Sequence, residues 1–317
     1  MKKFTLLLII LSLSTYSIAQ VTVEIASQPK QLTPEDEYFM RPTWSSNGQF
    51  LAFTTQNYHG IWVMALATGN VTKLVEKEGS GYKFAWSPDG LYIVYRARNS
   101  ENKKTKHSIE LVQIHTKEVE IIEKPSKRVG NPQWGHNNSS LFYTINHKLK
   151  QYTTGIFTES ALKKPLPGSD RYLAFLENQK LQLAPLKDTL DHRIHLPSEN
   201  VINPSLSPDS RKIMYEVYGG DLTIFDLFTG KSNSFGNGYR AVWSPDGNWI
   251  SYMVTEDDGH TYLSSDIVIA NVDGKNVMKI TKTNDLLEMN PAWSPDGLSL
   301  AFDEHKTGII YEIDLNL

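Results

Sequence analysis

One pentapeptide constrains this chain more than any other feature. The sequence Trp-Ser-Pro-Asp-Gly begins at Trp86 and recurs unchanged at Trp243 and Trp293. Looser copies begin at Trp44, Trp134 and Leu206. Each copy has an aromatic residue nine positions after its first residue: Phe53, Tyr95, Tyr143, Tyr215, Tyr252 and Phe302. The same offset between Leu166 and Phe175 identifies a seventh, degenerate copy. A period of this kind indicates a fold built from repeated supersecondary units.

The repeat length and its residues favour a β-propeller. Successive copies are separated by between 32 residues (134 to 166) and 50 residues (243 to 293), and propeller blades have periods of about 40–45 residues. Segments between the copies alternate apolar and polar residues, as half-buried strands do. In each copy Pro and Asp start a tight turn, Gly supplies its positive φ, and the preceding Trp is expected to pack between sheets.

We therefore predict an all-β propeller of seven four-stranded blades. Six blades is the alternative, if the segment from Leu166 to Leu196 is an insertion in the third blade. The chain ends in the third strand of its last repeat, and Gln28–Thr33 resembles the fourth strand at Val277–Thr281. We expect this N-terminal strand to close the last blade, which removes an open sheet edge.

The first residues predict export. Lys2 and Lys3 precede an apolar run from Phe4 to Leu13, and Ala19 ends a small-residue cleavage pattern. The run is shorter than the roughly 20 residues of a membrane span. We predict a signal peptide over residues 1–19, a single propeller domain over 20–317 and a periplasmic or secreted protein. The chain has no cysteine, so a lipid-modified N-terminal Cys is excluded and the fold must hold without disulfides.

Charge does not select a partner. The chain has 32 Lys plus Arg against 35 Asp plus Glu, a formal net charge of −3. Such a balance favours neither nucleic acid nor a membrane surface. We expect no nucleic-acid partner, no transmembrane segment after signal cleavage, no cofactor and a monomer.

These repeats resemble the TolB-type β-propeller family, a WD-repeat-like family defined by the same Trp-Ser-Pro-Asp-Gly unit. The resemblance covers essentially all of residues 20–317 and implies a stand-alone propeller, since the α/β domain that precedes the propeller in the family's namesake is not recognisable. Such propellers serve as periplasmic interaction scaffolds, as gating domains of peptidases and as a few polysaccharide-active enzymes.

A ring of hydrogen-bond donors is the candidate binding site. One donor stands three positions before the first residue of every repeat: Arg41, Lys83, Asn131, Lys163, Asn203, Arg240 and Asn290. Because inner strands border the channel of a propeller, these side chains are expected to line its mouth and to bind carboxylates or hydroxyls. The alternative is that they are strand-entry turns with solvated cations.

Histidines suggest a second site on the rim. Five are expected in connections between the second and third strands: His59, His107, His147, His260 and His305. Rim aromatics such as Tyr58 and Tyr262 are candidates for stacking on sugars. The turn carboxylates, by contrast, are expected to be structural.

The predicted function is a non-enzymatic scaffold that binds an envelope or extracellular protein, peptide or glycan through its funnel and one rim. The alternative is a metal-assisted lyase or hydrolase acting on acidic oligosaccharides, with rim histidines as metal ligands. No Gly-x-Ser-x-Gly elbow of an α/β-hydrolase occurs in the sequence.

Overall fold

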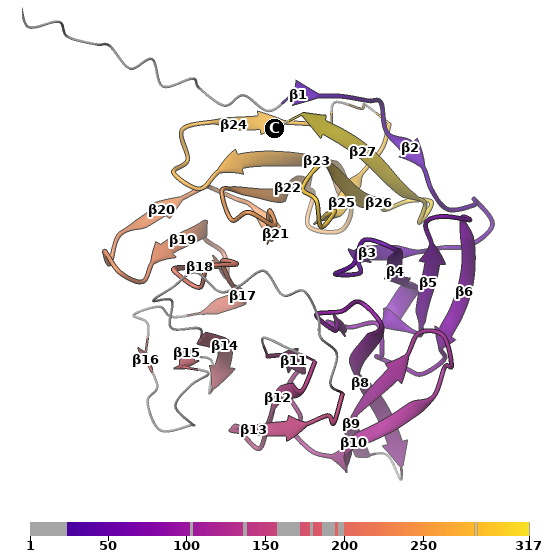
Figure 1. Cartoon of the computed structure of the whole chain (residues 1–317). Coiled ribbons are helices and arrows are strands. Elements are labelled where there is room, and N and C mark those ends of the chain that lie inside the picture. Colours follow the sequence, from indigo (N-terminus) through magenta and orange to yellow (C-terminus); the bar gives the residue numbers. More distant parts are fainter. Residues whose placement is uncertain are drawn as a thin grey trace, which may run out of the picture.

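The chain folds into a ring of antiparallel sheets. The computed structural model describes residues 24–101, 104–135, 138–156, 172–177, 180–185, 194–195, 200–281, 283 and 285–316. Their strands form seven sheets that radiate from a central axis (Figure 1). The predicted all-β propeller is confirmed. An inner strand is described for six of the sheets; in the remaining one, the predicted repeat start at Leu166 lies outside the described residues.

The sheets are numbered as blades in chain order. Blade 1 contains β3 (Met40–Trp44), β4 (Phe50–Thr54), β5 (Ile61–Ala65) and β6 (Asn70–Val75). Blade 2 contains β7 (Ala85–Trp86), β8 (Tyr92–Glu101), β9 (Lys104–Gln113) and β10 (Val119–Ser126). Blade 3 contains β11 (Gln133–Trp134), β12 (Ser140–Ile145) and β13 (Lys148–Thr153). Blade 4 contains β14 (Tyr172–Glu177), β15 (Lys180–Pro185) and β16 (Ile194–His195).

Blade 5 contains β17 (Val201–Leu206), β18 (Lys212–Val217), β19 (Leu222–Asp226) and β20 (Ser232–Ser234). Blade 6 contains β21 (Tyr239–Trp243), β22 (Trp249–Asp257), β23 (Tyr262–Asn271) and β24 (Val277–Lys279). Blade 7 contains β25 (Glu288–Trp293), β26 (Ser299–Glu304) and β27 (Ile310–Asn316), with β1 (Glu24–Ile25) and β2 (Lys30–Gln31) on its outer edge.

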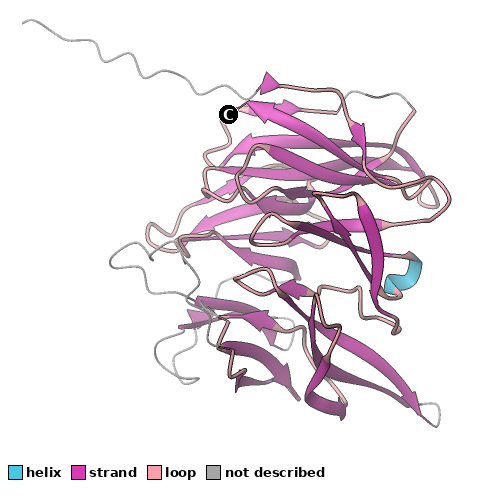
Figure 2. Ribbon diagram, turned by 45° about the vertical axis from the view of Figure 1, so that its right-hand side comes forward, coloured by secondary structure: helices cyan, strands magenta, loops and turns pink. Residues whose placement is uncertain are grey.

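Two features differ in detail from the expectation. Blades 3 and 4 each have three strands within the described residues, where four were expected. One helical turn, η1 (Gln56–Tyr58), lies between β4 and β5 and is the only helix in the described ranges (Figure 2). Across the same ranges, no helix is long and apolar enough to cross a membrane.

The repeated Ser-Pro-Asp-Gly turns are built by their own side chains. In the copy at Ser294, the hydroxyl donates to Asp296 and accepts a 2.9 Å bond from the backbone N–H of Ser299. Oδ1 of Asp296 also accepts from the backbone N–H of Leu298 at 3.0 Å. The same pattern occurs around Asp89, Asp209 and Asp246. These carboxylates are Asx-turn residues, as expected from the sequence.

The tryptophans join neighbouring blades. The indole N–H of Trp86 donates to the backbone carbonyl of Thr43 in blade 1 at 3.0 Å, and that of Trp44 donates to Ala292 in blade 7 at 3.2 Å. Trp134 and Trp243 make equivalent bonds to their preceding blades. Each of these four repeats therefore fixes its own turn and is also bonded to the blade before it.

The N-terminal segment closes the ring, as predicted. In β2, Lys30 pairs with Glu312 and Gln31 with Tyr311 of β27. The backbone N–H of Leu32 donates to the carbonyl of Ile310 at 2.8 Å. Closure also has a core, because Phe39 and Phe53 of the first repeat belong to one buried cluster with Ala301 and Ile310 of blade 7. A propeller closed in this way has no open edge between its first and last blades.

Candidate functional site

The predicted donors share a backbone conformation that explains their common offset. Five of them have left-handed φ angles: Arg41 (58°), Lys83 (53°), Asn203 (50°), Arg240 (55°) and Asn290 (51°). The strand register slips at this point in four inner strands, β3, β17, β21 and β25. These slips are β-bulges, which turn a side chain away from its regular direction. Non-glycine residues in such conformations cost about 1–3 kcal/mol each and concentrate at functional sites.

Two buried carboxylates hold the bulges in place. Asp303 accepts a 2.8 Å hydrogen bond from the backbone N–H of Arg41 and a 3.0 Å bond from the Asn290 amide. Glu216 does the same in another pair of blades, accepting from the backbone N–H of Arg240 at 2.8 Å and from the Asn203 amide at 3.0 Å. Each carboxylate thus joins two adjacent blades.

The pKa of Asp303 is strongly shifted by its surroundings. Burial raises the pKa of its carboxyl to about 7, and the hydrogen bonds from Arg41 and Asn290 oppose that rise. Neither Asp303 nor Glu216 was among the residues predicted from the sequence. Both directly follow the aromatic residue of their repeat, where other repeats carry Thr, Arg, Leu or Met.

Three cations from different blades converge at this end of the channel. Burial lowers the pKa of Lys83, and the positive charges of Arg240 and Arg41 lower it further. The pKa of Arg41 is lowered by burial and then by Arg240. Charges shift one another's pKa in this way only when they are separated by no more than about a Debye length. We call Arg41, Lys83 and Arg240 the cationic funnel.

A pair of tyrosines borders the cationic funnel. The guanidinium of Arg41 lies 5.1 Å from the ring centroid of Tyr58. The Lys83 ammonium and the Arg96 guanidinium lie 5.8 and 5.6 Å from the ring centroid of Tyr82. The two tyrosine rings meet edge to face, with centroids 5.0 Å apart. Tyr82 was not predicted from the sequence, since it stands in a connection without a repeat position.

The structure says less about the last two predicted donors, Asn131 and Lys163. Asn131 and Lys83 line a cavity of about 790 Å³ between β11, β14 and β17. The side-chain oxygen of Asn131 is buried and has no hydrogen-bond partner within the described part of the chain. Lys163 lies outside the described residues.

The structure brings two of the five predicted histidines together. His59 and His107 line one cavity of about 610 Å³ on the rim between blades 1 and 2. His107 corrects the sequence interpretation in one respect, because it lies within β9 and not in a connection. Burial lowers its pKa, as do the charges of Arg96 and Arg98.

The other three histidines lie in turns of other blades. His147 is in the β12–β13 turn with a φ of 67°, and His260 is in the β22–β23 turn. His305 follows β26 and contacts the ring of Tyr262, with centroids 5.3 Å apart. Among the described residues, no group of three or more His, Asp or Glu side chains could hold a metal ion.

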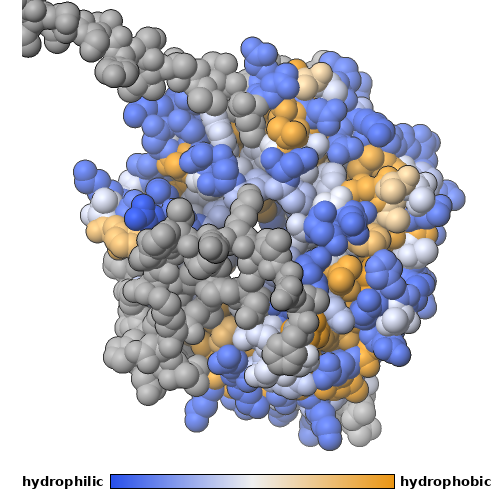
Figure 3. Space-filling view, in the orientation of Figure 1, coloured by the Kyte–Doolittle hydropathy of each residue, from blue (hydrophilic) through white to orange (hydrophobic). Residues whose placement is uncertain are grey.

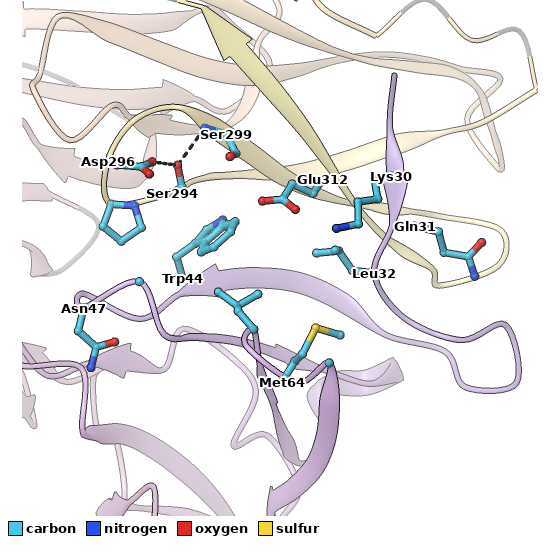
Figure 4. A pocket seen from close by; sticks show the side chains of 14 residues that line it. Lys30, Gln31, Leu32, Trp44, Asn47, Met64, Ser294, Asp296, Ser299 and Glu312 are labelled. Carbon is cyan, nitrogen blue, oxygen red and sulfur yellow. Dashed lines mark hydrogen bonds between the residues drawn. The ribbon is translucent and has the colours of Figure 1, made fainter. Parts of the chain in front are cut away.

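A third cavity lies at the closure seam, beside the Ser-Pro-Asp-Gly turns and thus at the opposite ends of the inner strands from Arg41. It has a volume of about 600 Å³, and Trp44, Met64 and Leu32 line it together with Lys30, Glu312 and Asp296 (Figure 4). Burial raises the pKa of Glu312, with a further contribution from Asp314. This cavity contains none of the predicted donors.

Comparison with known proteins supports the fold and a distant relationship. No protein-family model matches the chain. The Tol-Pal system proteins TolB of Francisella tularensis subsp. mediasiatica (strain FSC147) and subsp. tularensis (strain SCHU S4 / Schu 4) are each 23% identical over 280 residues, which is 83% of this chain. The match covers 56% and 55% of those proteins, so the chain spans about half the length of the curated relatives it matches.

A solved structure agrees with the architecture. A chain from the crystal structure of a mitotic checkpoint complex superposes with a TM-score of 0.58 at 14% identity, covering 99% of this chain and 98% of that one. At this identity the likeness shows the fold alone. The chain is a distant homologue of TolB and a TolB-like β-propeller.

Proposed function

We propose that this TolB-like propeller is a non-enzymatic binding module that holds a carboxylate-bearing protein, peptide or glycan in its cationic funnel. The observation that carries the proposal is the convergence of Arg41, Lys83 and Arg240, from three different blades, on one end of the channel. Half-buried like charges destabilise a fold, and an anion bound between them removes that cost.

In the described part of the chain, Asp303 and Glu216 form no side-chain ion pair with the funnel cations, although the charge of Asp303 opposes the lowering of the Arg41 pKa and that of Glu216 opposes the lowering of the Lys83 pKa. Asp303 and Glu216 accept hydrogen bonds from the backbone N–H groups of Arg41 and Arg240 and from asparagine amides. The guanidinium of Arg41 lies over the ring of Tyr58, and the ammonium of Lys83 lies over the ring of Tyr82. Carboxylates suit them because charge-assisted hydrogen bonds to Arg and Lys are the strongest available. The predicted donors Asn131 and Lys163 would extend the ring of donors, whereas the amides of Asn203 and Asn290 already donate to Glu216 and Asp303.

The proposal includes a place for the protein in the cell. The TolB relatives are named for the Tol-Pal system, and residues 1–19 of this chain have the pattern of a cleaved signal peptide. These residues lie outside the described part of the structure. We infer export to the periplasm or beyond, where the module would meet its partner.

Calorimetric titration with a hexaglutamate peptide tests the funnel. We expect saturable binding that weakens with salt, and no binding of hexaglutamine. The variants Lys83→Gln and Arg240→Gln should each weaken hexaglutamate binding about ten-fold or more, since one charge-assisted hydrogen bond contributes about 1.5–3 kcal/mol. Lys275→Gln, at a turn lysine whose side chain is 80% exposed, is the matched control and should bind normally. Unchanged affinity in folded Lys83 and Arg240 variants would exclude the funnel as the binding site.

A further inference from the structure

A second binding site adjoins the funnel on the rim between blades 1 and 2. Its cavity, the one lined by His59 and His107, has a volume of about 610 Å³, within the range of about 300–1,000 Å³ typical of small-molecule sites. The η1 connection, the connection of residues 76–84 and strands β8 and β9 form its walls. We call it the rim cavity.

The lining of the rim cavity has an unusual composition. Its described lining contains tyrosine, histidine, arginine, amide and carboxylate side chains and a glycine, and no aliphatic side chain. Peptide-binding grooves generally take apolar side chains into apolar pockets. Aromatic rings combined with planar polar groups instead match a sugar, which presents apolar C–H faces and many hydroxyls.

The walls are held rigidly. Asn57 and Tyr58 are consecutive residues with left-handed φ angles of 57° and 56°. The carbonyl of Tyr58 accepts a 3.1 Å bond from the N–H of Gly81, which ties the two connections together. Gly81 leaves no room for a side chain, because a Cβ there would lie 1.8 Å from Oγ1 of Thr54. Strain fixed in this way is typical of a preorganised site, where little entropy is lost on binding.

Positive charge lines one wall. Arg96 and Arg98 lie two residues apart on β8 and so on the same face of the strand. His107 is the cross-strand partner of Arg98. Within the described residues, Nε of Arg96 is buried without a hydrogen-bond partner, while its Nη1 donates to the carbonyl of Val129 at 3.0 Å. The Arg98 side chain forms one ion pair within the described residues, at 3.9 Å to the exposed Glu78.

From this geometry we propose that the rim cavity binds a sugar residue that carries a carboxylate, a uronate-type unit of an acidic oligosaccharide. The Tyr58–Tyr82 pair forms the aromatic wall beside the sugar, Arg96 and Arg98 bind the carboxylate, and His107 bonds to hydroxyls. The inference rests on the proposed function in one respect, the binding of a second acidic unit. Tyr58 and Tyr82 lie between the rim cavity and the funnel residues Arg41 and Lys83. The next acidic unit of the same oligosaccharide would therefore bind in the funnel.

Trigalacturonate is the test probe. Maltotriose serves as the sugar without charge, and hexaglutamate serves as the anion without sugar. In titration calorimetry on the full protein, trigalacturonate should bind and maltotriose should not. Arg98→Gln should weaken trigalacturonate binding about ten-fold, as expected for loss of one charge-assisted bond. It should change hexaglutamate binding by less than about two-fold. Tyr82→Leu should weaken trigalacturonate binding as well, but it also removes a contact of Lys83, so the selectivity is measured with Arg98→Gln alone. Lys275→Gln should change neither affinity.

The outcomes separate this inference from the funnel. No binding of trigalacturonate, equal binding of maltotriose, or an unaffected Arg98→Gln variant would each overturn the rim site, even if hexaglutamate still binds. Trigalacturonate binding that depends on Arg98 but not on Lys83 or Arg240 would support the rim site and show that the oligosaccharide does not extend into the funnel. Because Arg98 has a side chain 51% exposed, its replacement is not expected to unfold the protein; circular dichroism checks this for both variants.

Discussion

The backbone N–H of Arg41 donates a 2.8 Å hydrogen bond to Oδ1 of Asp303, 262 residues later in the chain. One bond thereby connects the first inner strand to the last blade and holds the bulge that places Arg41 in the funnel. Ring closure and the candidate binding site are therefore coupled through a single buried carboxyl group. Its ionisation affects both.

Asp303 should make the stability of the protein depend on pH. Its pKa is raised to about 7 in the folded state from an ordinary value of 3.8, so between these values the folded state binds more protons than the unfolded state. Stability must then fall as pH rises from about 4 to 7 and level off above, by at most about 4 kcal/mol. Asp303→Asn keeps an acceptor oxygen for Arg41 and removes the titration. We expect urea unfolding to show a smaller loss of stability between pH 5 and pH 8 in this variant than in the wild type.

The comparison with Asp303→Asn also isolates this group. Burial raises the pKa of Glu288 and Glu312 as well, and both remain in the variant, so their contributions cancel in the difference. Parallel pH profiles for wild type and variant would show that Asp303 does not titrate in this range.

The closing strand depends on one buried hydroxyl. Oγ1 of Thr33 accepts a 2.9 Å bond from the backbone N–H of Ile310, and Thr33 is 2% exposed. Thr33→Val keeps the shape but leaves that N–H unpaired, which should cost about 1–3 kcal/mol of unfolding free energy. Thr72→Val, on the exposed side of outer strand β6, is the matched control and should change stability by no more than about 0.5 kcal/mol. Equal effects of the two changes in urea unfolding would mean that the closure bond does not stabilise the ring.

Much of this fold could be predicted because its repeat is defined by hydrogen bonds between residues that are close in the sequence. In the turn at Ser294 the bonds made by Ser294 and Asp296 lie within five residues, so the pentapeptide itself defines the hairpin. The closing strand was also predictable, since its sequence resembles the fourth strand of another repeat. His107 was misplaced because the polar stretch around it resembles a loop, whereas β8 and β9 pair along ten residues each and extend the hairpin past it.

The candidate site was predictable only in part. A constant offset selected Arg41, Lys83 and Arg240, but the cause of the offset, a bulge with left-handed φ, has no residue signature when Arg and Lys occupy it. Asp303 was missed because the backbone N–H that it binds belongs to Arg41, 262 residues away in the sequence. Tyr82 was missed because it stands in a connection without a repeat position.

Lys83 should oppose stability while supporting binding. Burial and the charges of Arg240 and Arg41 lower its pKa, so the folded state holds this proton less firmly than the unfolded state. Replacing it by Gln removes that repulsion, and we expect a gain of about 0.5 kcal/mol or less, because a half-buried site is partly screened by solvent. Thermal unfolding at pH 7 and pH 10 measures the effect. The gain should be smaller at pH 10 than at pH 7, because a lowered pKa lets the folded protein give up this proton at a lower pH than the unfolded chain does. A clear loss of stability at pH 7 would mean that Lys83 is a structural residue.

Two tryptophans at equivalent positions should respond differently to the same substitution. Trp86 and Trp293 are 8% and 7% exposed and each begins a Trp-Ser-Pro-Asp-Gly turn. The indole N–H of Trp86 donates to Thr43 at 3.0 Å, whereas Nε1 of Trp293 is buried with no hydrogen-bond partner among the described residues. Phenylalanine removes similar volume at both sites, so the cavity cost is comparable. At Trp86 it also leaves a buried carbonyl without its donor, while at Trp293 it removes an unpaired polar group. Trp86→Phe should therefore be more destabilising than Trp293→Phe by about 1–3 kcal/mol in urea unfolding, and an equal loss at both positions would show that the inter-blade indole bond does not hold the ring together.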